Sequence, residues 1–447
     1  MKLRRVSLEN FRAKQATELK LGSRLTLLMG ENGSGKTTYL DAVAIALGAI
    51  LTYLPKVSGI TFRKRGDIFQ CNGREAPYTR IVAESMEDGL AWDCLKRRDK
   101  SQRTTEQVPP RLGVRALRQY LDRKIIEPWQ EYYSSEEESS FELPVLAYYG
   151  VSRAVLDVPM RRRGFSKNYT RFDLLADSLN ATSRFRSAFI WFYNKENEEL
   201  RLQKDKRDFD ARLPELETVR RCISSLLPHV SNPRTDTNPL RFLVSYQGQE
   251  FEIDQLSGGC KTMLGLAMDL GRRMVEANPS SPDPLATEAI VLIDEVDLHL
   301  HPEWQQHVVS GLLRTFPHTQ FILTSHSPIL VESINNLLKR HDVDSLLTKI
   351  HQEGLETEIE SDEMTFIKDL YPLAPKDTCV YSLSKDNEHN EHNEPENLLD
   401  LDQGLTGDTL IEWFNKVSAT FYRMRDLEDD FESAEAVYGS SDEEEKL

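Results

Sequence analysis

The chain has 447 residues, of which 39% are hydrophobic and 29% charged, so it can bury a core and is not a disordered chain. At about 150 residues per domain, this length predicts about three domains or one large domain with insertions. The longest nearly apolar run, residues 42–54, is shorter than the roughly 18–20 residues of a membrane-spanning helix. With no secretory signal and five scattered cysteines that form no CxxC pair, we expect a reduced, cytoplasmic protein that does not enter a membrane.

The first 54 residues predict two strands followed by a helix. Residues 2–8 alternate polar and apolar side chains as a strand does, and residues 25–29 are apolar. A glycine-rich turn follows directly, and residues 37–49 have helical spacing. This strand–turn–helix order is the context in which a phosphate-binding loop occurs.

The middle of the chain carries two basic clusters, at residues 96–103 and 161–171. Around them, residues 60–145 predict short strands and polar loops, and residues 143–149 predict a further strand. The clusters would suit a nucleic-acid backbone, because neutralising phosphates supplies most non-specific affinity. A solvated loop explains them equally well.

From residue 172 onward the pattern favours helices that alternate with strands. Residues 172–226 have a helical pattern, and residues 241–253 predict a hairpin around Gln247 and Gly248. Helices and buried parallel strands then alternate at residues 256–277, 289–293, 302–314 and 320–324. This order predicts an α/β fold with a mostly parallel core sheet.

Beyond about residue 375 the chain becomes polar and strongly acidic. Residues 385–397 predict a low-complexity, disordered linker, and an acidic tail begins at Glu428. The net charge from Asp386 to Leu447 is −15, out of −16 for the whole chain, so the preceding residues are close to neutral. The overall acidity therefore does not exclude basic surfaces on the folded body.

The strongest motif is GENGSGKT at residues 30–37, which satisfies GxxxxGK[ST] between a strand and a helix. Its glycines allow successive backbone N–H groups to turn toward phosphates at the positive end of a helix. Lys36 would reach the β- and γ-phosphates of ATP, and the Thr37 hydroxyl would coordinate Mg²⁺. The predicted nucleotide-binding residues of this loop are Gly30, Asn32, Gly33, Ser34, Gly35, Lys36, Thr37 and Thr38.

Two buried strands end in further candidates. Residues 289–293 lead into Asp294 and Glu295, at the edge where a parallel sheet presents its ligands. Asp294 would hold Mg²⁺ and Glu295 would act as general base on the attacking water. The strand at residues 320–324 leads to His326, which would contact the γ-phosphate, so the predicted catalytic residues are Lys36, Glu295 and His326.

A third signal is LSGG at residues 256–259, about 35 residues before the acidic pair. Ser257, Gly258 and Gly259 open a predicted helix, and a serine with two glycines at a helix N-terminus would form a second phosphate cradle. Because LSGG lies between the phosphate loop and the acidic strand end, a chance match to this short motif is not expected.

Together and in this order, these motifs resemble the ABC-type ATPases of the SMC, RecF and OLD group, including its AAA_21-like members. LENFR at residues 8–12 matches that group's opening motif, which would place Asn10 and Arg12 near the nucleotide. The resemblance implies a head-to-tail homodimer, or a higher oligomer built from it. Ser257, Gly258 and Gly259 would then act in trans on ATP bound to the other copy, and Asp297 would lie at the dimer interface.

The chain also departs from that group. Only about 200 residues separate the phosphate-loop helix from LSGG, so long coiled-coil arms are not expected. The glutamine of the Q-loop is not evident, and YYGVSR at residues 148–153 takes roughly its place. The resemblance implies an ATPase head (1–54 and 240–335), an inserted β and helical region (55–239), a C-terminal extension (336–384), a linker (385–397) and a helical segment with the acidic tail (398–447).

A compact head of this kind resembles the PtuA-type ATPases of Septu and retron anti-phage systems. That resemblance implies a sensor or regulator of a separate HNH nuclease, with a retron reverse transcriptase and its DNA–RNA hybrid as further partners. Two alternatives stay open: a RecF-like DNA-repair ATPase, and a self-contained OLD-like ATP-gated nuclease. An intrinsic nuclease is not expected, because Asp342, Asp344, Asp400 and Asp402 match the DxD pattern only trivially.

Overall fold

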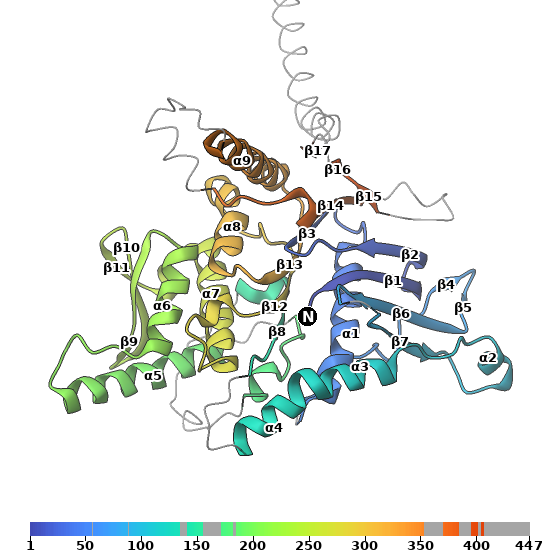
Figure 1. The fold of residues 1–447 in the computed structure, drawn as a ribbon, viewed down its shortest axis with the longest axis horizontal. Coiled ribbons are helices and arrows are strands. Elements are labelled where there is room, and N and C mark those ends of the chain that lie inside the picture. The colour runs from blue at the N-terminus through green and yellow to red at the C-terminus, as the bar shows by residue number, and fades with distance from the viewer. Residues whose placement is uncertain are drawn as a thin grey trace, which may run out of the picture.

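The computed structural model describes residues 1–55, 57–87, 89–134, 141–154, 171–181, 185–352, 370–383, 395–400 and 404–405. Its central element is a six-stranded sheet in the order β15-β14-β3-β13-β12-β8 (Figure 1). Five strands run parallel: β3 (Leu25–Gly30), β8 (Val145–Tyr149), β12 (Ala289–Ile293), β13 (Thr319–Ser325) and β14 (Thr378–Leu383). The edge strand β15 (Glu396–Asn397) is antiparallel to β14. The predicted fold class, α/β with a mostly parallel core sheet, is confirmed.

The central strands are buried along their whole length because both faces of the sheet are covered. Every residue of β3, β8, β12 and β13 is buried, as is typical of strands in parallel sheets. The register pairs Ile293 with Leu323 and Ser325 with Met29. The carboxyl ends of β3, β12 and β13 therefore meet at one edge of the sheet, directly before the predicted site residues.

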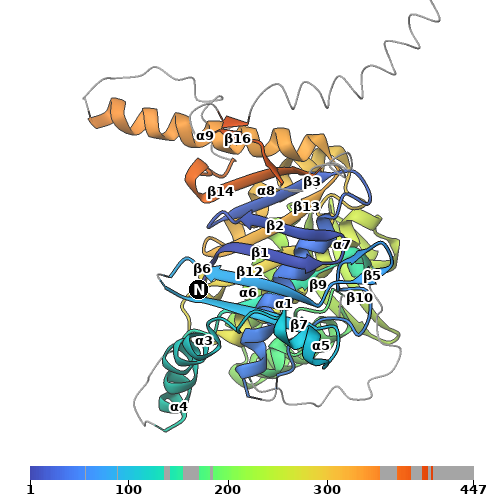
Figure 2. The same cartoon turned by 90° about the vertical axis from the view of Figure 1, so that its right-hand side faces the viewer.

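One face is covered by helix α1 (Lys36–Tyr53) and a second sheet. This sheet is antiparallel, in the order β2 (Lys14–Lys20), β1 (Leu3–Phe11), β6 (Tyr78–Ser85) and β7 (Ala91–Arg97), and Figure 2 shows it in front of α1. Trp92 of β7 donates its indole N–H to the carbonyl of Ala46 on α1, at 3.0 Å. Because α1 lies between two sheets, the helix that begins at the phosphate loop is held on both sides.

The other face is covered by four helices, on the left of Figure 1: α5 (Phe185–Lys206), α6 (Pro214–Leu226), α7 (Gly258–Ala277) and α8 (Pro302–Thr315). A three-stranded antiparallel sheet of β9 (Val230–Thr237), β10 (Leu240–Tyr246) and β11 (Gln249–Glu252) packs on them. Phe242 of β10 contacts the ring of Phe192 on α5, with centroids 5.3 Å apart. The predicted hairpin turn at Gln247 and Gly248 is present, and both residues have positive φ.

Residues 102–134 form helices, where the sequence predicted only short strands and loops. The segment contains α2 (Gln102–Glu106), α3 (Val114–Leu121), a π-helical turn (Asp122–Ile126) and α4 (Glu127–Ser134). The prediction was wrong because Leu117, Leu121 and Ile125 recur every four residues and bury one helical face. The strands predicted in this region are present before residue 102: the short pair β4 (Gln70–Cys71) and β5 (Arg74–Glu75), and the longer strands β6 and β7.

Three strands of the central sheet come from outside the ranges predicted for the head, and one of them, β15, lies at the end of the linker predicted at 385–397. β8 lies in the predicted insertion, and β14 lies in the predicted C-terminal extension, after the long helix α9 (Pro328–Gln352). The remaining short elements are 3-10 turns at Val151–Ala154, Asp173–Leu175, Ile253–Gln255, Pro284–Ala286 and Pro375–Asp377, with the pair β16 (Leu399–Asp400) and β17 (Gly404–Leu405).

Several predictions fall on residues outside the described ranges. These are all of the second basic cluster except Arg171, most of the linker at 385–397, and the acidic tail. Among the helices that the structure does describe, none is long and apolar enough to cross a membrane.

Candidate nucleotide site

The loop between β3 and α1 has the backbone of a phosphate cradle. Gly33 and Gly35 have φ angles of 83° and 95°, which L side chains rarely adopt. At Gly30 a Cβ would lie 2.4 Å from the carbonyl oxygen of Leu383 on β14, so only glycine fits there. Thr38 donates its amide to Gly35 at 2.9 Å, which begins the helix. Asn32 and Gly33 are exposed at the tip.

Lys36 and Ser34 are the buried polar residues of this loop. The Lys36 ammonium donates to the carbonyls of Gly30 and Glu31, each at 2.8 Å, and lies 3.4 Å from Nδ1 of His326. The Ser34 hydroxyl is buried and has no hydrogen-bond partner among the described residues. A phosphate oxygen would accept from both side chains, so the loop fits the predicted ligand.

Asp294 follows β12 and contacts the loop directly. The Thr37 hydroxyl donates to one carboxylate oxygen at 3.0 Å, and the Thr324 hydroxyl donates to the other at 2.6 Å. A hydroxyl and a carboxylate are hard oxygen ligands of the kind that Mg²⁺ prefers. The donor set at Thr37 and Asp294 therefore fits the predicted metal.

Glu295 and His326 lie side by side at the ends of β12 and β13. Oε1 of Glu295 is 3.4 Å from Nε2 of His326, and both side chains are partly exposed. Glu295 has a positive φ of 49°, and its amide donates to the Thr324 hydroxyl at 2.7 Å. Thr324 therefore fixes both acidic residues, and the five predicted residues Lys36, Thr37, Asp294, Glu295 and His326 are brought together at one edge of the sheet.

The opening motif also reaches this region, although indirectly. Arg12 forms ion pairs with Asp41 of α1 at 2.7 Å and with Asp67 at 3.0 Å. Asp41 lies little more than one turn after Lys36, so Arg12 is anchored beside the loop. Asn10 has a positive φ of 51° at the end of β1.

The predicted signature, Ser257–Gly259, is separate from these contacts. Ser257 caps α7 by accepting from the amide of Cys260 at 3.3 Å, and it is exposed. A Cβ on Gly259 would lie 2.6 Å from the carbonyl oxygen of His299, so the glycine lets the loop after Glu295 rest on α7. In that loop, one carboxylate oxygen of Asp297 is buried without a hydrogen-bond partner among the described residues.

A family model described as "AAA domain, putative AbiEii toxin, Type IV TA system" matches residues 25–332, which is more than half of the chain. The chain belongs to this AAA domain family. The match spans both the phosphate loop and the acidic strand end, so the family assignment and the assembled site coincide.

Curated relatives of this AAA domain protein include two probable retron ATPases. Retron Vc95 probable ATPase of Vibrio cholerae serotype O1 biovar El Tor is 26% identical over 385 residues, 75% of this chain and 72% of that protein. Retron Ec83 probable ATPase of Escherichia coli is 44% identical over 121 residues, 27% of this chain and 22% of that protein. Septu protein PtuA of Bacillus mycoides (strain KBAB4) is 41% identical over 83 residues, 19% and 11% of the two chains.

These matches confirm the resemblance to retron and PtuA-type ATPases. Among solved structures, an Smc head bound to the C-terminal winged-helix domain of ScpA aligns with 15% identity and a TM-score of 0.41. It covers 74% of this chain and 92% of that one.

The sequence prediction missed Tyr148 and Tyr149, the last two residues of β8. Their side chains leave the strand on opposite faces, as neighbours in a strand do. Tyr148 donates to Asp41 on α1 at 3.1 Å, and Tyr149 donates to Asp269 on α7 at 3.0 Å. The carbonyl of Tyr149 also accepts from the amide of Asp294 at 2.8 Å. The sequence does carry a signal for these contacts: two adjacent tyrosines end a predicted strand, so their side chains must point to opposite faces of the sheet.

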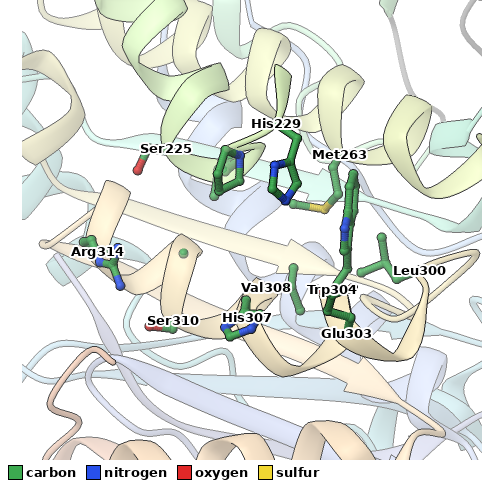
Figure 3. Close-up of a pocket in the computed structure, with 13 residues that line it drawn as sticks. Ser225, His229, Met263, Leu300, Glu303, Trp304, His307, Val308, Ser310 and Arg314 are labelled. Carbon is green, nitrogen blue, oxygen red and sulfur yellow. The ribbon is translucent and has the colours of Figure 1, made fainter. Parts of the chain in front are cut away.

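A separate pocket of about 420 Å³ lies between α6, α7 and α8. Figure 3 shows Trp304 of α8 near His229 and Met263, and Arg314 of α8 at the other end of the pocket, below Ser225. None of the predicted site residues lines this pocket. Of the DxD residues of the alternative nuclease, Asp344 pairs with Arg340 at 2.7 Å on α9, and Asp402 lies outside the described residues. No group of three potential metal ligands occurs among the described residues.

Proposed function

We propose that the chain binds ATP with Mg²⁺ and hydrolyses it, and that this activity regulates a separate nuclease in anti-phage defence. The observation that carries the proposal is the assembly of Lys36, Thr37, Asp294, Glu295 and His326 at the carboxyl edge of one sheet. Five residues from three distant segments are held there by hydrogen bonds that match the needs of phosphoryl transfer.

Each side chain has a role that follows from its position. Lys36, which already hydrogen-bonds loop carbonyls, would donate to the terminal phosphates. Thr37 and Asp294 would hold Mg²⁺, which supplies charge neutralisation on the phosphates when bound. Glu295 would accept a proton from the attacking water, and His326, 3.4 Å away, would orient that carboxylate and contact the γ-phosphate.

The dimer is part of the same proposal. Among the described residues, Ser257 and Gly258 make their hydrogen bonds within the first turns of α7, and both are exposed. A second copy placed head-to-tail would bring that helix N-terminus to the phosphates bound at Lys36. The buried oxygen of Asp297 would gain its partner from the same second copy.

The names of the similar proteins support a role in anti-phage defence. Retron ATPases and PtuA of Septu are similar to this chain over the stretches given above. We therefore propose a cytoplasmic complex with a separate HNH nuclease, in which a retron reverse transcriptase and its DNA–RNA hybrid take part.

A basic surface favours a nucleic-acid component. The Lys96 ammonium donates to the carbonyls of Arg63 and Lys64, which joins residues 63–65 to the cluster at 96–103. Exposed basic side chains there have no carboxylate partner among the described residues: Lys64, Arg65, Arg97, Lys100 and Arg103. Such unpaired cations would suit a phosphate backbone.

The enzymatic proposal is tested with Glu295→Gln. We expect ATP to bind as in the wild type and turnover to fall by about 100-fold or more, because the general base is lost. Phosphate release and ATP affinity are measured on the same preparation. Glu303→Gln, an exposed glutamate at the start of α8, serves as the control. Wild-type turnover by Glu295→Gln would rule out the assigned base.

The partner is tested by recovering the tagged chain from its native host, with and without ATP, and identifying the bound proteins by mass spectrometry. Recovery of an HNH protein would support the regulatory role. A homodimer alone would contradict it and favour the OLD-like or RecF-like alternative. Metal-dependent cleavage by the isolated chain then separates these two.

A further inference from the structure

Lys14 begins β2 and lies against the phosphate loop from the neighbouring sheet. Its Cε is 3.6 Å from the position that a Cβ on Gly35 would occupy. Gly35 is the last residue before Lys36 and the N-cap of α1. A side chain from the antiparallel sheet therefore reaches the cradle that β3 and α1 form.

The ammonium of Lys14 is half-buried and has no hydrogen bond or ion pair among the described residues. Among the described residues, the ammonium lies over the face of Tyr39, whose ring centroid is 5.7 Å away. Tyr39 is itself fixed, because it is buried and its hydroxyl shares a 3.0 Å hydrogen bond with Thr17. Burial lowers the pKa of Lys14, and no acidic side chain of the described residues offsets that cost.

The neighbouring cation, Arg12, has carboxylate partners that Lys14 lacks among the described residues. Arg12, two residues earlier, is neutralised by Asp41 and Asp67. A partly desolvated ammonium without an anion is unfavourable, and proteins normally pair such groups. At Lys14 the anion must come from outside the described chain, and the adjacent surface is the phosphate loop.

We infer that Lys14 binds the diphosphate that ATP and ADP share, and so joins the antiparallel sheet to the bound nucleotide. This inference rests on the proposed ATP binding. The contact with Gly35, rather than with the Glu295 and His326 side of the loop, favours the diphosphate over the γ-phosphate. Lys14 then adds affinity without taking part in proton transfer.

Affinity for ADP and ATP, measured by calorimetry on the full chain, tests the contact. Lys14→Met keeps the side-chain length and removes the charge, and we expect the Kd of both nucleotides to rise by about tenfold. At saturating ATP the kcat stays unchanged while KM rises. Lys14→Arg retains most of the affinity, and Lys20→Met, exposed at the far end of the same strand, changes nothing.

Proton uptake on nucleotide binding is a second measurement, and it would not change if Lys14 had only a structural role. An anion beside Lys14 raises its lowered pKa, so at alkaline pH, where free Lys14 is partly deprotonated, the wild type takes up protons on binding ADP and Lys14→Met does not. Comparing buffers of different ionisation enthalpy measures this uptake.

The outcomes are distinct. Equal affinity and equal proton uptake in Lys14→Met and wild type overturn the inference, although ATP binding stands. Binding of inorganic phosphate alone that disappears in Lys14→Met, with ADP affinity unchanged, also overturns it. A wild-type chain that binds neither nucleotide rejects the proposed function itself.

Discussion

The two halves of the proposed ATP site differ in how the single chain holds them. At the phosphate loop, hydrogen bonds link Thr37, Asp294 and Thr324 across α1, β12 and β13. At the signature, Ser257 is exposed, and its hydrogen bonds among the described residues are to its own helix. The first half is therefore preorganised within one chain, whereas the second presents donors that no part of the same described chain uses. In the proposed dimer, a second molecule would complete the site from the signature half.

Removing the centre of the preorganised half has the largest expected effect. Lys36→Ala deletes the buried ammonium and is expected to raise the Kd for ATP by about 100-fold or more, since several charge-assisted hydrogen bonds are lost together. Dimer formation in ATP is expected to disappear with it, as measured by light scattering. Lys64→Ala, exposed and without an ion pair among the described residues, is the control. Unchanged ATP affinity would refute the role of the loop.

The signature half is tested with Ser257→Arg. A long cationic side chain at the N-terminus of α7 blocks the approach of a second copy, while the phosphate loop is untouched. We expect normal ATP affinity, no ATP-dependent dimer, and turnover reduced by about 100-fold, as when a preorganised donor is lost. Ser224→Arg, on the exposed face of α6, is the matched substitution. A fully active Ser257→Arg variant would exclude the in-trans site.

The two signature glycines separate packing from ligand contact. A Cβ on Gly259 meets the His299 carbonyl at 2.6 Å, whereas one on Gly258 stays 3.4 Å from His299. Gly259→Ala is expected to lower the free energy of unfolding by about 1–3 kcal/mol, because the backbone must shift. Gly258→Ala keeps wild-type stability and affects turnover alone. Denaturant unfolding of both variants measures the difference in stability. Equal stability would show that the close approach of Gly259 to the His299 carbonyl does not limit stability.

The sequence predicted the elements whose signal is local. A glycine-rich turn after an apolar strand, and carboxylates after another, place Lys36 and Asp294 correctly at one sheet edge. The prediction missed β14, which is flanked by polar residues and lies far along the sequence from the predicted head. Its place beside β3 depends on a long-range pairing that local sequence patterns do not show. The prediction also missed the helices at 102–134, where Leu117, Leu121 and Ile125 recur every four residues between polar side chains. Contacts such as those of Tyr148 and Tyr149 depend on the finished packing.

Substituting Tyr148 or Tyr149 is expected to have the smallest effect, and it tests whether the two halves of the site are independent within one chain. Tyr149→Phe removes one hydrogen bond to Asp269, whose carboxylate keeps Arg272 and Arg273 at 2.9 and 2.7 Å. Although burial opposes ionisation, these arginines hold the pKa of Asp269 down at about 2, so the buried charge remains paired. We expect a loss of about 1 kcal/mol in unfolding free energy.

ATP affinity of Tyr149→Phe is expected to stay unchanged, because the hydroxyl contacts α7 and not α1. Tyr148→Phe is the matched variant, since its hydroxyl contacts Asp41 on α1, which also holds Arg12. If the two halves are independent within one chain, only Tyr148→Phe shifts the Kd for ATP. A shift in Tyr149→Phe would show instead that β8 transmits the state of α7 to the phosphate loop before any second copy arrives.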